Sequence, residues 1–166
     1  GCQRLTTAEL SNSLRKIGDY AFRSSGLESI ELPDSVEEIG REAFSGCQKL
    51  AFAMVGNGVT VVGISAFENC ALTTVTIGNR VEVIDDCAFA GNRKLSKVVI
   101  PQNVTRMEYA AFRDCEALAD ITFPDALTKI DGWALDGTSW YGGQADGMVY
   151  AGKVAYHYKG DMPAET

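Results

Sequence analysis

The sequence has little of what most enzyme sites, metal sites and membrane segments need. It contains one histidine, His157, and five cysteines, none of them in a Cys-x-x-Cys pair. A lone histidine excludes mechanisms that use a histidine pair, and a zinc site has no anchor without closely spaced cysteines. No window approaches the roughly 18 uninterrupted apolar residues of a membrane-spanning helix. We therefore expect no cofactor, no metal and no membrane insertion of this segment.

Basic residues are also scarce. The chain has 15 Lys and Arg against 22 Asp and Glu, which gives a net charge of −7. An acidic chain gains no counterion-release energy from a phosphate backbone, so we expect no nucleic-acid partner. The rest of the composition, 46% hydrophobic and 22% charged, is typical of a globular domain and excludes a disordered tail.

A repeat of 22 to 23 residues runs through most of the chain. An aromatic or aliphatic residue follows alanine at one phase of the repeat: Phe22, Phe44, Phe67, Phe89, Phe112 and Leu135. Aliphatic residues recur five and eight positions before each of these. A period of this length is typical of leucine-rich solenoids. We expect six coils, at roughly 2–24, 25–46, 47–69, 70–91, 92–114 and 115–137.

Each unit also contains a short strand signature. In the unit that starts at Cys47, the residues Leu50, Ala53 and Val55 have the spacing L-x-x-L-x-L. Because side chains alternate along a strand, Ala53 and Val55 are expected to face inward. A lone repeat cannot bury its apolar face, so stability is expected to come from neighbouring coils. The two 22-residue steps lack one residue, which we place in the convex turn.

The repeats resemble a known family. One copy that carries the resemblance reads Leu27-x-x-Ile30-x-Leu32-Pro33-x-x-Val36-x-x-Ile39-Gly40-x-x-Ala43-Phe44-x-x-Cys47. It is similar to the BspA-like (Treponema pallidum-type) leucine-rich repeat. The resemblance implies an α/β-type repeat solenoid: a right-handed coil with a parallel concave β-sheet and short strands or 3-10 turns on the convex side. It also implies a bacterial cell-surface or secreted protein that adheres to host extracellular matrix.

Residues 138–166 lack the repeat and are expected to form a capping or connector segment. Gly142-Gly143 and Ala151-Gly152 are turn signals, so we expect a β-hairpin with strands near 147–151 and 153–158. Trp140 and Tyr141 are expected to cover the open end of the last coil. The segment resembles a hairpin insert between repeat blocks in gut bacterial surface proteins of this family. We therefore expect the chain to be a piece of a longer protein.

The cysteines share a repeat position with small polar residues. Cys2, Cys47, Cys70 and Cys115 occupy the phase that Ser25, Asn92 and Thr138 fill elsewhere. Such a position favours a small buried filler, with a disulfide or a metal site as the alternatives. Cys87 does not occupy this repeat position, and of the five cysteines it is the one expected to be a reactive thiol. No nucleophile, base and orienting acid converge, and His157 is expected on the hairpin surface, so we expect no enzyme.

The outward strand positions form the candidate binding site. Phe52 and Met54 are large apolar residues in a solvent-facing phase, with polar residues in neighbouring coils. Exposed apolar area of this kind marks interaction sites, although single exposed apolar residues are also common. The candidate partner-binding residues are Phe52, Met54, Thr74, Thr76, Lys97 and Val99, with the rim charges Glu31 and Asp120.

Two functions remain open at this point. The first is a non-catalytic module that binds a protein or glycan through the concave sheet. The second is a structural spacer or self-assembly segment, which would associate end to end through its exposed coils and bind nothing through its face. Binding by the sheet face distinguishes them.

Overall fold

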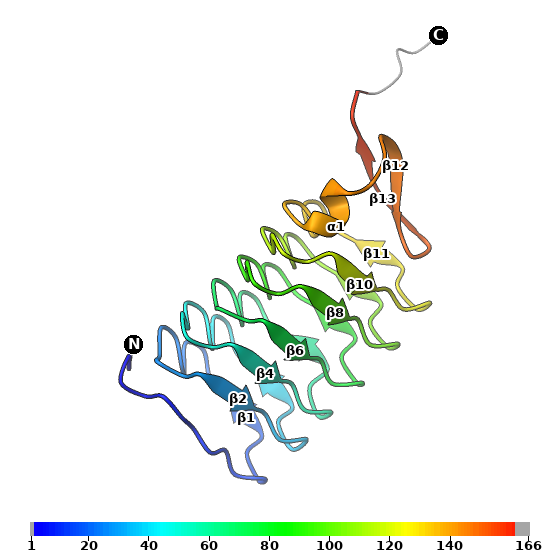
Figure 1. The fold of residues 1–166 in the computed structure, drawn as a ribbon. Coiled ribbons are helices and arrows are strands. Elements are labelled where there is room, and N and C mark those ends of the chain that lie inside the picture. The colour runs from blue at the N-terminus through cyan, green and yellow to red at the C-terminus, as the bar shows by residue number, and fades with distance from the viewer. Residues whose placement is uncertain (1, 162–166) are drawn as a thin grey trace.

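The computed structural model describes residues 2–161, which form a stack of parallel coils closed by a hairpin (Figure 1). The strands on one face form the front sheet: β2 (Ser29–Glu31), β4 (Phe52–Met54), β6 (Thr74–Thr76), β8 (Lys97–Val99) and β10 (Asp120–Thr122). The strands on the opposite face form the rear sheet: β1 (Lys16–Ile17), β3 (Glu38–Ile39), β5 (Val61–Val62), β7 (Val83–Ile84), β9 (Arg106–Met107) and β11 (Lys129–Ile130).

This arrangement confirms the predicted solenoid. Neighbouring strands within each sheet are parallel, and equivalent residues of successive coils pair with one another, as in Ser29 with Phe52 and Phe52 with Thr74. Turns and two-residue strands fill the rear side. The only helix among residues 2–161 is the short α1 (Ser139–Gly142). No helix in that range is long and apolar enough to cross a bilayer.

Stacked phenylalanines form the centre of the core. From Phe22 to Phe112 the successive ring centroids lie 4.9 to 5.5 Å apart, with the ring planes within 13° of parallel. The backbone N–H of each ring's residue donates to the carbonyl of the alanine before the next ring, as in Phe44 to Ala66 at 2.8 Å. The aliphatic residues of the repeat fill the space around this ladder; those of the middle coils are almost fully buried, and several in the first and last coils are half-buried.

Left-handed backbone marks both sides of every core aromatic position. Two residues before it the φ angle is positive at Tyr20, Glu42, Ser65, Cys87, Ala110 and Trp133. Two residues after it the φ angle is positive at Ser24, Gly46, Asn69, Gly91, Asp114 and Gly137. Such angles are uncommon for residues other than glycine and costly for bulky ones. Each coil therefore has left-handed backbone at the same two positions, which the spacing of the apolar residues does not predict.

One buried asparagine compensates for a missing residue. In the coils of normal length, the leucine after the turn donates its N–H to a carbonyl three residues earlier, as in Leu95 to Asn92 at 3.1 Å. The coil at 70–91 is one residue shorter, and Leu72 donates instead to the side-chain oxygen of Asn92 at 3.2 Å. Asn92 is fully buried and also donates to the carbonyls of Phe67 and Phe89 at 2.8 and 2.7 Å.

The front sheet is interrupted between β6 and β8. Elsewhere the residue after a front strand donates its N–H to the next coil, as in Val55 to Thr76 at 2.8 Å and Ile100 to Thr122 at 3.0 Å. Within the described residues, β6 and β8 are not hydrogen-bonded, and Ile77 makes no such bond. The rear sheet has a similar interruption between β3 and β5. Each interruption borders one of the two 22-residue coils.

The interruption predicts a local difference in amide hydrogen exchange. The N–H of Ile77 is expected to exchange at least about tenfold faster than those of Val55 and Ile100, because it lacks their inter-coil bond. Exchange measured by NMR on the folded chain tests this, since the two comparison amides hold the same repeat position. Equal protection of all three would contradict an open β6–β8 step.

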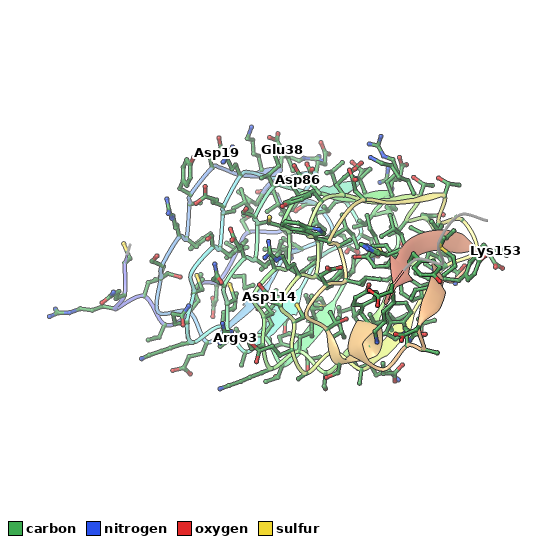
Figure 2. The ribbon with its side chains drawn as sticks, turned by 90° about the horizontal axis from the view of Figure 1, so that it is seen from above. Asp19, Glu38, Asp86, Arg93, Asp114 and Lys153 are labelled. Carbon is green, nitrogen blue, oxygen red and sulfur yellow. The ribbon has the colours of Figure 1, made fainter. Side chains whose placement is uncertain are left out.

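A β-hairpin packs on the last coil. Strands β12 (Gly147–Ala151) and β13 (Val154–Lys159) pair antiparallel, close to the predicted positions. The Tyr156 hydroxyl donates to Asp136 at 2.7 Å and accepts the N–H of Leu135 at 3.0 Å, which ties the hairpin to the coil. Lys153, at the hairpin end of the molecule in Figure 2, forms an ion pair with Asp125 at 2.7 Å.

Trp140 and Tyr141, which were both predicted to cover the open end of the last coil, have different roles. Trp140 packs against the core and meets Phe123 edge to face, with centroids 5.2 Å apart. Tyr141 packs instead against the hairpin, with its ring centroid 5.8 Å from that of Tyr156. Trp140 therefore covers core, whereas Tyr141 helps to attach the hairpin.

Candidate binding surface

All the predicted site residues lie on the outer face of the front sheet. The inner residue of each strand is buried or half-buried, and the residues on either side of it face outward, as in β6 with Val75 between Thr74 and Thr76. The surface runs in order from Glu31 on β2 to Asp120 on β10. Side chains alternate along each strand, and equivalent residues of successive coils lie side by side. These residues, although distant in sequence, therefore share one face of the sheet.

The apolar residues of this surface lie on β4 and β8. Phe52 and Met54 point outward but are half-buried, flanked across the sheet by Ser29 and Thr74, and by Glu31 and Thr76. Val99 is 55% exposed and is the most exposed large apolar residue of the front strands. The apolar contact area therefore extends from β4 to β8.

A cavity of about 490 Å³ lies at the β6–β8 step. Its walls include the outward residues Thr74, Thr76, Lys97 and Val99. Beneath them Val75 and Ile77 are each 8% exposed, whereas the corresponding residues of the preceding coil, Ala53 and Val55, are 0% and 2% exposed. The interruption of the ladder thus opens the sheet slightly to solvent. We call this feature the slit and define it by Thr74–Ile77 and Lys97–Val99.

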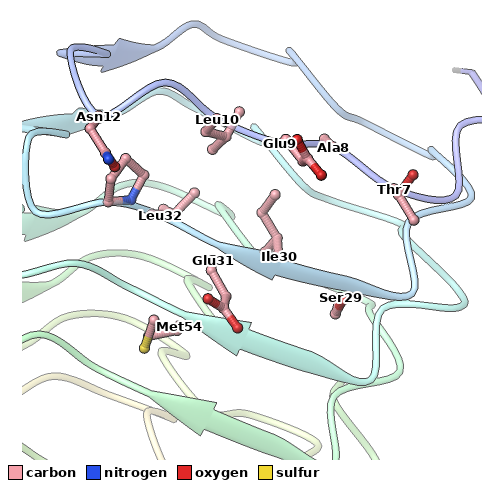
Figure 3. Close-up of a pocket in the computed structure, with 11 residues that line it drawn as sticks. Thr7, Ala8, Glu9, Leu10, Asn12, Ser29, Ile30, Glu31, Leu32 and Met54 are labelled. Atoms are coloured by element: carbon pink, nitrogen blue, oxygen red, sulfur yellow. The ribbon is translucent and has the colours of Figure 1, made fainter.

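The charges on the front sheet fall into two groups. Lys97 forms an ion pair with Asp120 across the β8–β10 step at 2.6 Å, and the side chains of both are more than half exposed. Such a pair contributes little to stability but leaves no free charge there. Glu9 and Glu31 have no ion-pair partner among residues 2–161. They line a second cavity, of about 410 Å³, together with Met54 (Figure 3).

Three of the four cysteines at the shared repeat position, Cys47, Cys70 and Cys115, are buried free thiols; Cys2, in the first coil with no coil before it in the structure, is exposed, so the prediction of a buried filler is wrong for that residue. Each of the three buried thiols donates to the carbonyl of the phenylalanine in the preceding coil, as in Cys115 to Phe89 at 3.2 Å. Burial raises the pKa of the Cys115 thiol to about 12, and the neighbouring Cys47 thiol and burial raise that of Cys70. The position is therefore a hydrogen-bonding filler, a role that its occupancy by Cys, Ser, Asn and Thr already indicates.

Cys87 does not have the properties of an activated thiol. It is half-buried, and burial followed by the nearby Glu68 carboxylate raises the pKa of its thiol. Within the described part of the chain, no three His, Cys, Asp or Glu side chains are grouped so as to hold a metal ion. His157 lies on the hairpin beside Tyr141 and Tyr156, with ring centroids 6.1 and 6.0 Å away.

A second surface cluster was not predicted from the sequence. Trp133 is 45% exposed, with the Arg113 guanidinium 4.7 Å from its ring centroid and the Tyr109 ring 5.7 Å away. It occupies one of the left-handed turn positions, outside the front sheet. The signal in the sequence was an aromatic residue at a repeat position that the four middle coils fill with Glu, Ser, Cys or Ala, and that only the first coil also fills with an aromatic residue, Tyr20.

Comparison with known proteins agrees with this geometry. The BspA type leucine rich repeat region matches in six copies, over residues 1–96 and 82–141. The chain belongs to this family. Leucine-rich repeat proteins are in general non-catalytic, protein-binding modules. No curated protein matches the sequence.

Solved structures of bacterial leucine-rich repeat proteins share the fold. One from Bacteroides ovatus is 28% identical with a TM-score of 0.65, over 78% of this chain and 39% of that one. One from Eubacterium ventriosum is 27% identical with a TM-score of 0.76, over 81% and 37%. The leucine-rich repeat protein of T. pallidum is 23% identical with a TM-score of 0.50, over 74% and 48%. This BspA-type chain therefore spans less than half the length of each of these relatives.

Proposed function

We propose that this chain is a non-catalytic binding module of a bacterial cell-surface or secreted protein, and that its front sheet binds a protein partner. The observation that carries the proposal is the unpartnered outer face of that sheet, where Phe52, Met54 and Val99 lie among threonines. Half-exposed apolar and aromatic residues on a rigid surface are characteristic of protein interfaces. Because the strands hold these side chains in place before binding, little ordering entropy is lost.

Adhesion to host extracellular matrix is the specific role that we propose for the module. Glycan binding is the alternative ligand class, and both are tested by one screen of the chain against purified matrix proteins and immobilised surface glycans. The rival role, a structural spacer, predicts no binding by the front sheet and concentration-dependent association in sedimentation. A well-folded chain with that behaviour would overturn the proposal.

Phe52→Asp is expected to weaken binding of any ligand found in the screen by at least about tenfold. The substitution places a carboxylate at the centre of the contact, where burial without a partner is costly. Affinity is measured by biolayer interferometry, and circular dichroism checks that the variant is folded.

Trp133→Asp serves as the matched control. It makes the same aromatic-to-acid change on an exposed residue outside the front sheet, at a left-handed position that aspartate tolerates. If Trp133→Asp abolishes binding and Phe52→Asp leaves it intact, the binding surface is the Trp133 cluster and the front-sheet proposal is wrong.

A further inference from the structure

The slit differs from the rest of the front sheet because, within the described residues, no backbone hydrogen bond joins β6 to β8 across it, although each strand pairs with its other neighbour. β6 and β8 lie near enough for Cα separations below 8 Å, too close for another strand to enter between them. The space above the slit is bounded by Val99 and Pro101 and has Val75 and Ile77 at its base. A compact apolar side chain suits this depression, because it would cover the aliphatic base and displace water from it.

The other end of the front sheet carries uncompensated negative charge. Glu9 and Glu31 hold outward positions in successive coils, where like charges disfavour one another. Since Lys97 and Asp120 neutralise each other, the two glutamates set the net charge of the surface. Their cavity also includes Met54, Ala8 and Leu10, so it offers apolar contact beside the carboxylates. A lysine or arginine side chain matches both features, with its stem on apolar atoms and its charge at the carboxylates.

We propose that the front sheet binds an extended protein segment that places a lysine or arginine at the Glu9–Glu31 cavity and an aliphatic residue in the slit. This inference rests on the proposed function, because it uses the same surface and specifies the chemistry of its partner. The segment crosses the strands, with Phe52 and Met54 beneath its middle.

The spacing of the two anchor points sets the spacing of the two partner residues. The Glu9–Glu31 cavity lies between the first and second coils, and the slit lies between the fourth and fifth. The distance between these two points is three strand separations, or about 14 Å. An extended chain advances about 3.3–3.6 Å per residue, so four residues span this distance. An even separation also puts both side chains on the same face of an extended chain. The recognised pattern is therefore a basic residue and an aliphatic residue four positions apart.

The test is a selection from a displayed library of random 12-residue peptides on the immobilised 166-residue chain. We expect the selected peptides to be enriched in Lys or Arg four positions from Leu, Ile or Val. A synthetic peptide from the selected pool is then measured against the variants by fluorescence anisotropy. Glu9→Gln/Glu31→Gln is expected to weaken it about tenfold and to remove most of the salt dependence of binding. Val99→Asp is expected to weaken it by a similar factor.

Matched controls on the rear side separate local from general effects. Glu82→Gln removes an exposed carboxylate that has no ion-pair partner among residues 2–161, and Val61→Asp makes the same change as Val99→Asp on an exposed valine of β5. Neither is expected to change affinity more than about twofold, apart from a small general effect of net charge.

The outcomes distinguish the inference from the proposed function. Two results would overturn the inference but leave the front sheet as a binding surface. One is a set of selected peptides that lack the basic residue. The other is peptide binding that Phe52→Asp abolishes but Glu9→Gln/Glu31→Gln leaves unchanged. A selection that yields no binder, or binders that Phe52→Asp does not affect, would contradict both.

Discussion

Replacement of Phe67 by alanine is expected to lower the free energy of unfolding by about 3–5 kcal/mol. Its ring is fully buried and stacks between those of Phe44 and Phe89, with centroids 4.9 and 5.5 Å away. The neighbouring coils hold these rings in place, so the cavity left by the substitution collapses poorly. Urea unfolding followed by circular dichroism measures the effect.

Two further substitutions show whether the loss comes from the ladder. Phe67→Leu is expected to cost only about 1–1.5 kcal/mol, because it keeps most of the apolar volume and the sixth coil has Leu135 at the same position. Phe52→Ala, at a half-buried front-sheet residue, is expected to cost less than about 1.5 kcal/mol. A loss below about 1 kcal/mol for Phe67→Ala would show that the coils tolerate a gap in the ladder.

Asn92→Ala is expected to lower the free energy of unfolding by about 3 kcal/mol. The substitution leaves the N–H of Leu72 and the carbonyl of Phe67 buried without their partner. Each unsatisfied group of this kind costs about 1–3 kcal/mol. The measurement is again urea unfolding, and a change within about 0.5 kcal/mol would contradict the bridging role of this side chain.

A compensating change tests why asparagine is present. Asn92→Cys introduces the residue type found at this repeat position in Cys47, Cys70 and Cys115. The thiols of those cysteines donate to the phenylalanine carbonyl of the preceding coil. A thiol at position 92, however, gives the N–H of Leu72 a poorer acceptor than the amide oxygen. Inserting one residue between Ala71 and Leu72 returns the turn to normal length and provides the usual carbonyl three positions earlier. We expect the insertion to stabilise Asn92→Cys and to destabilise the chain that keeps Asn92.

The candidate surface could be read from the sequence to a considerable extent. The alternation around Ala53 identifies Phe52 and Met54 as outward, and the repeat period places Thr74, Thr76 and Val99 beside them. Glu9 also falls at an outward position, but nothing in the sequence shows that it lacks an ion pair while Lys97 has one. The slit could not be predicted either, because both of its strands have the ordinary repeat pattern.

The coil, its period, the buried face and the direction of the strand residues follow from the amino-acid pattern alone, since alternation along a strand and stacking of similar units are encoded in short local spacings. How one coil packs on the next is visible only in the folded chain. The Asn92 bridge and the break between β6 and β8 depend on contacts between residues twenty or more positions apart. The left-handed turns are a backbone feature that the apolar pattern does not show. The apolar pattern shows which two coils are one residue shorter, but it does not show how the neighbouring coils respond or which side chain fills the gap.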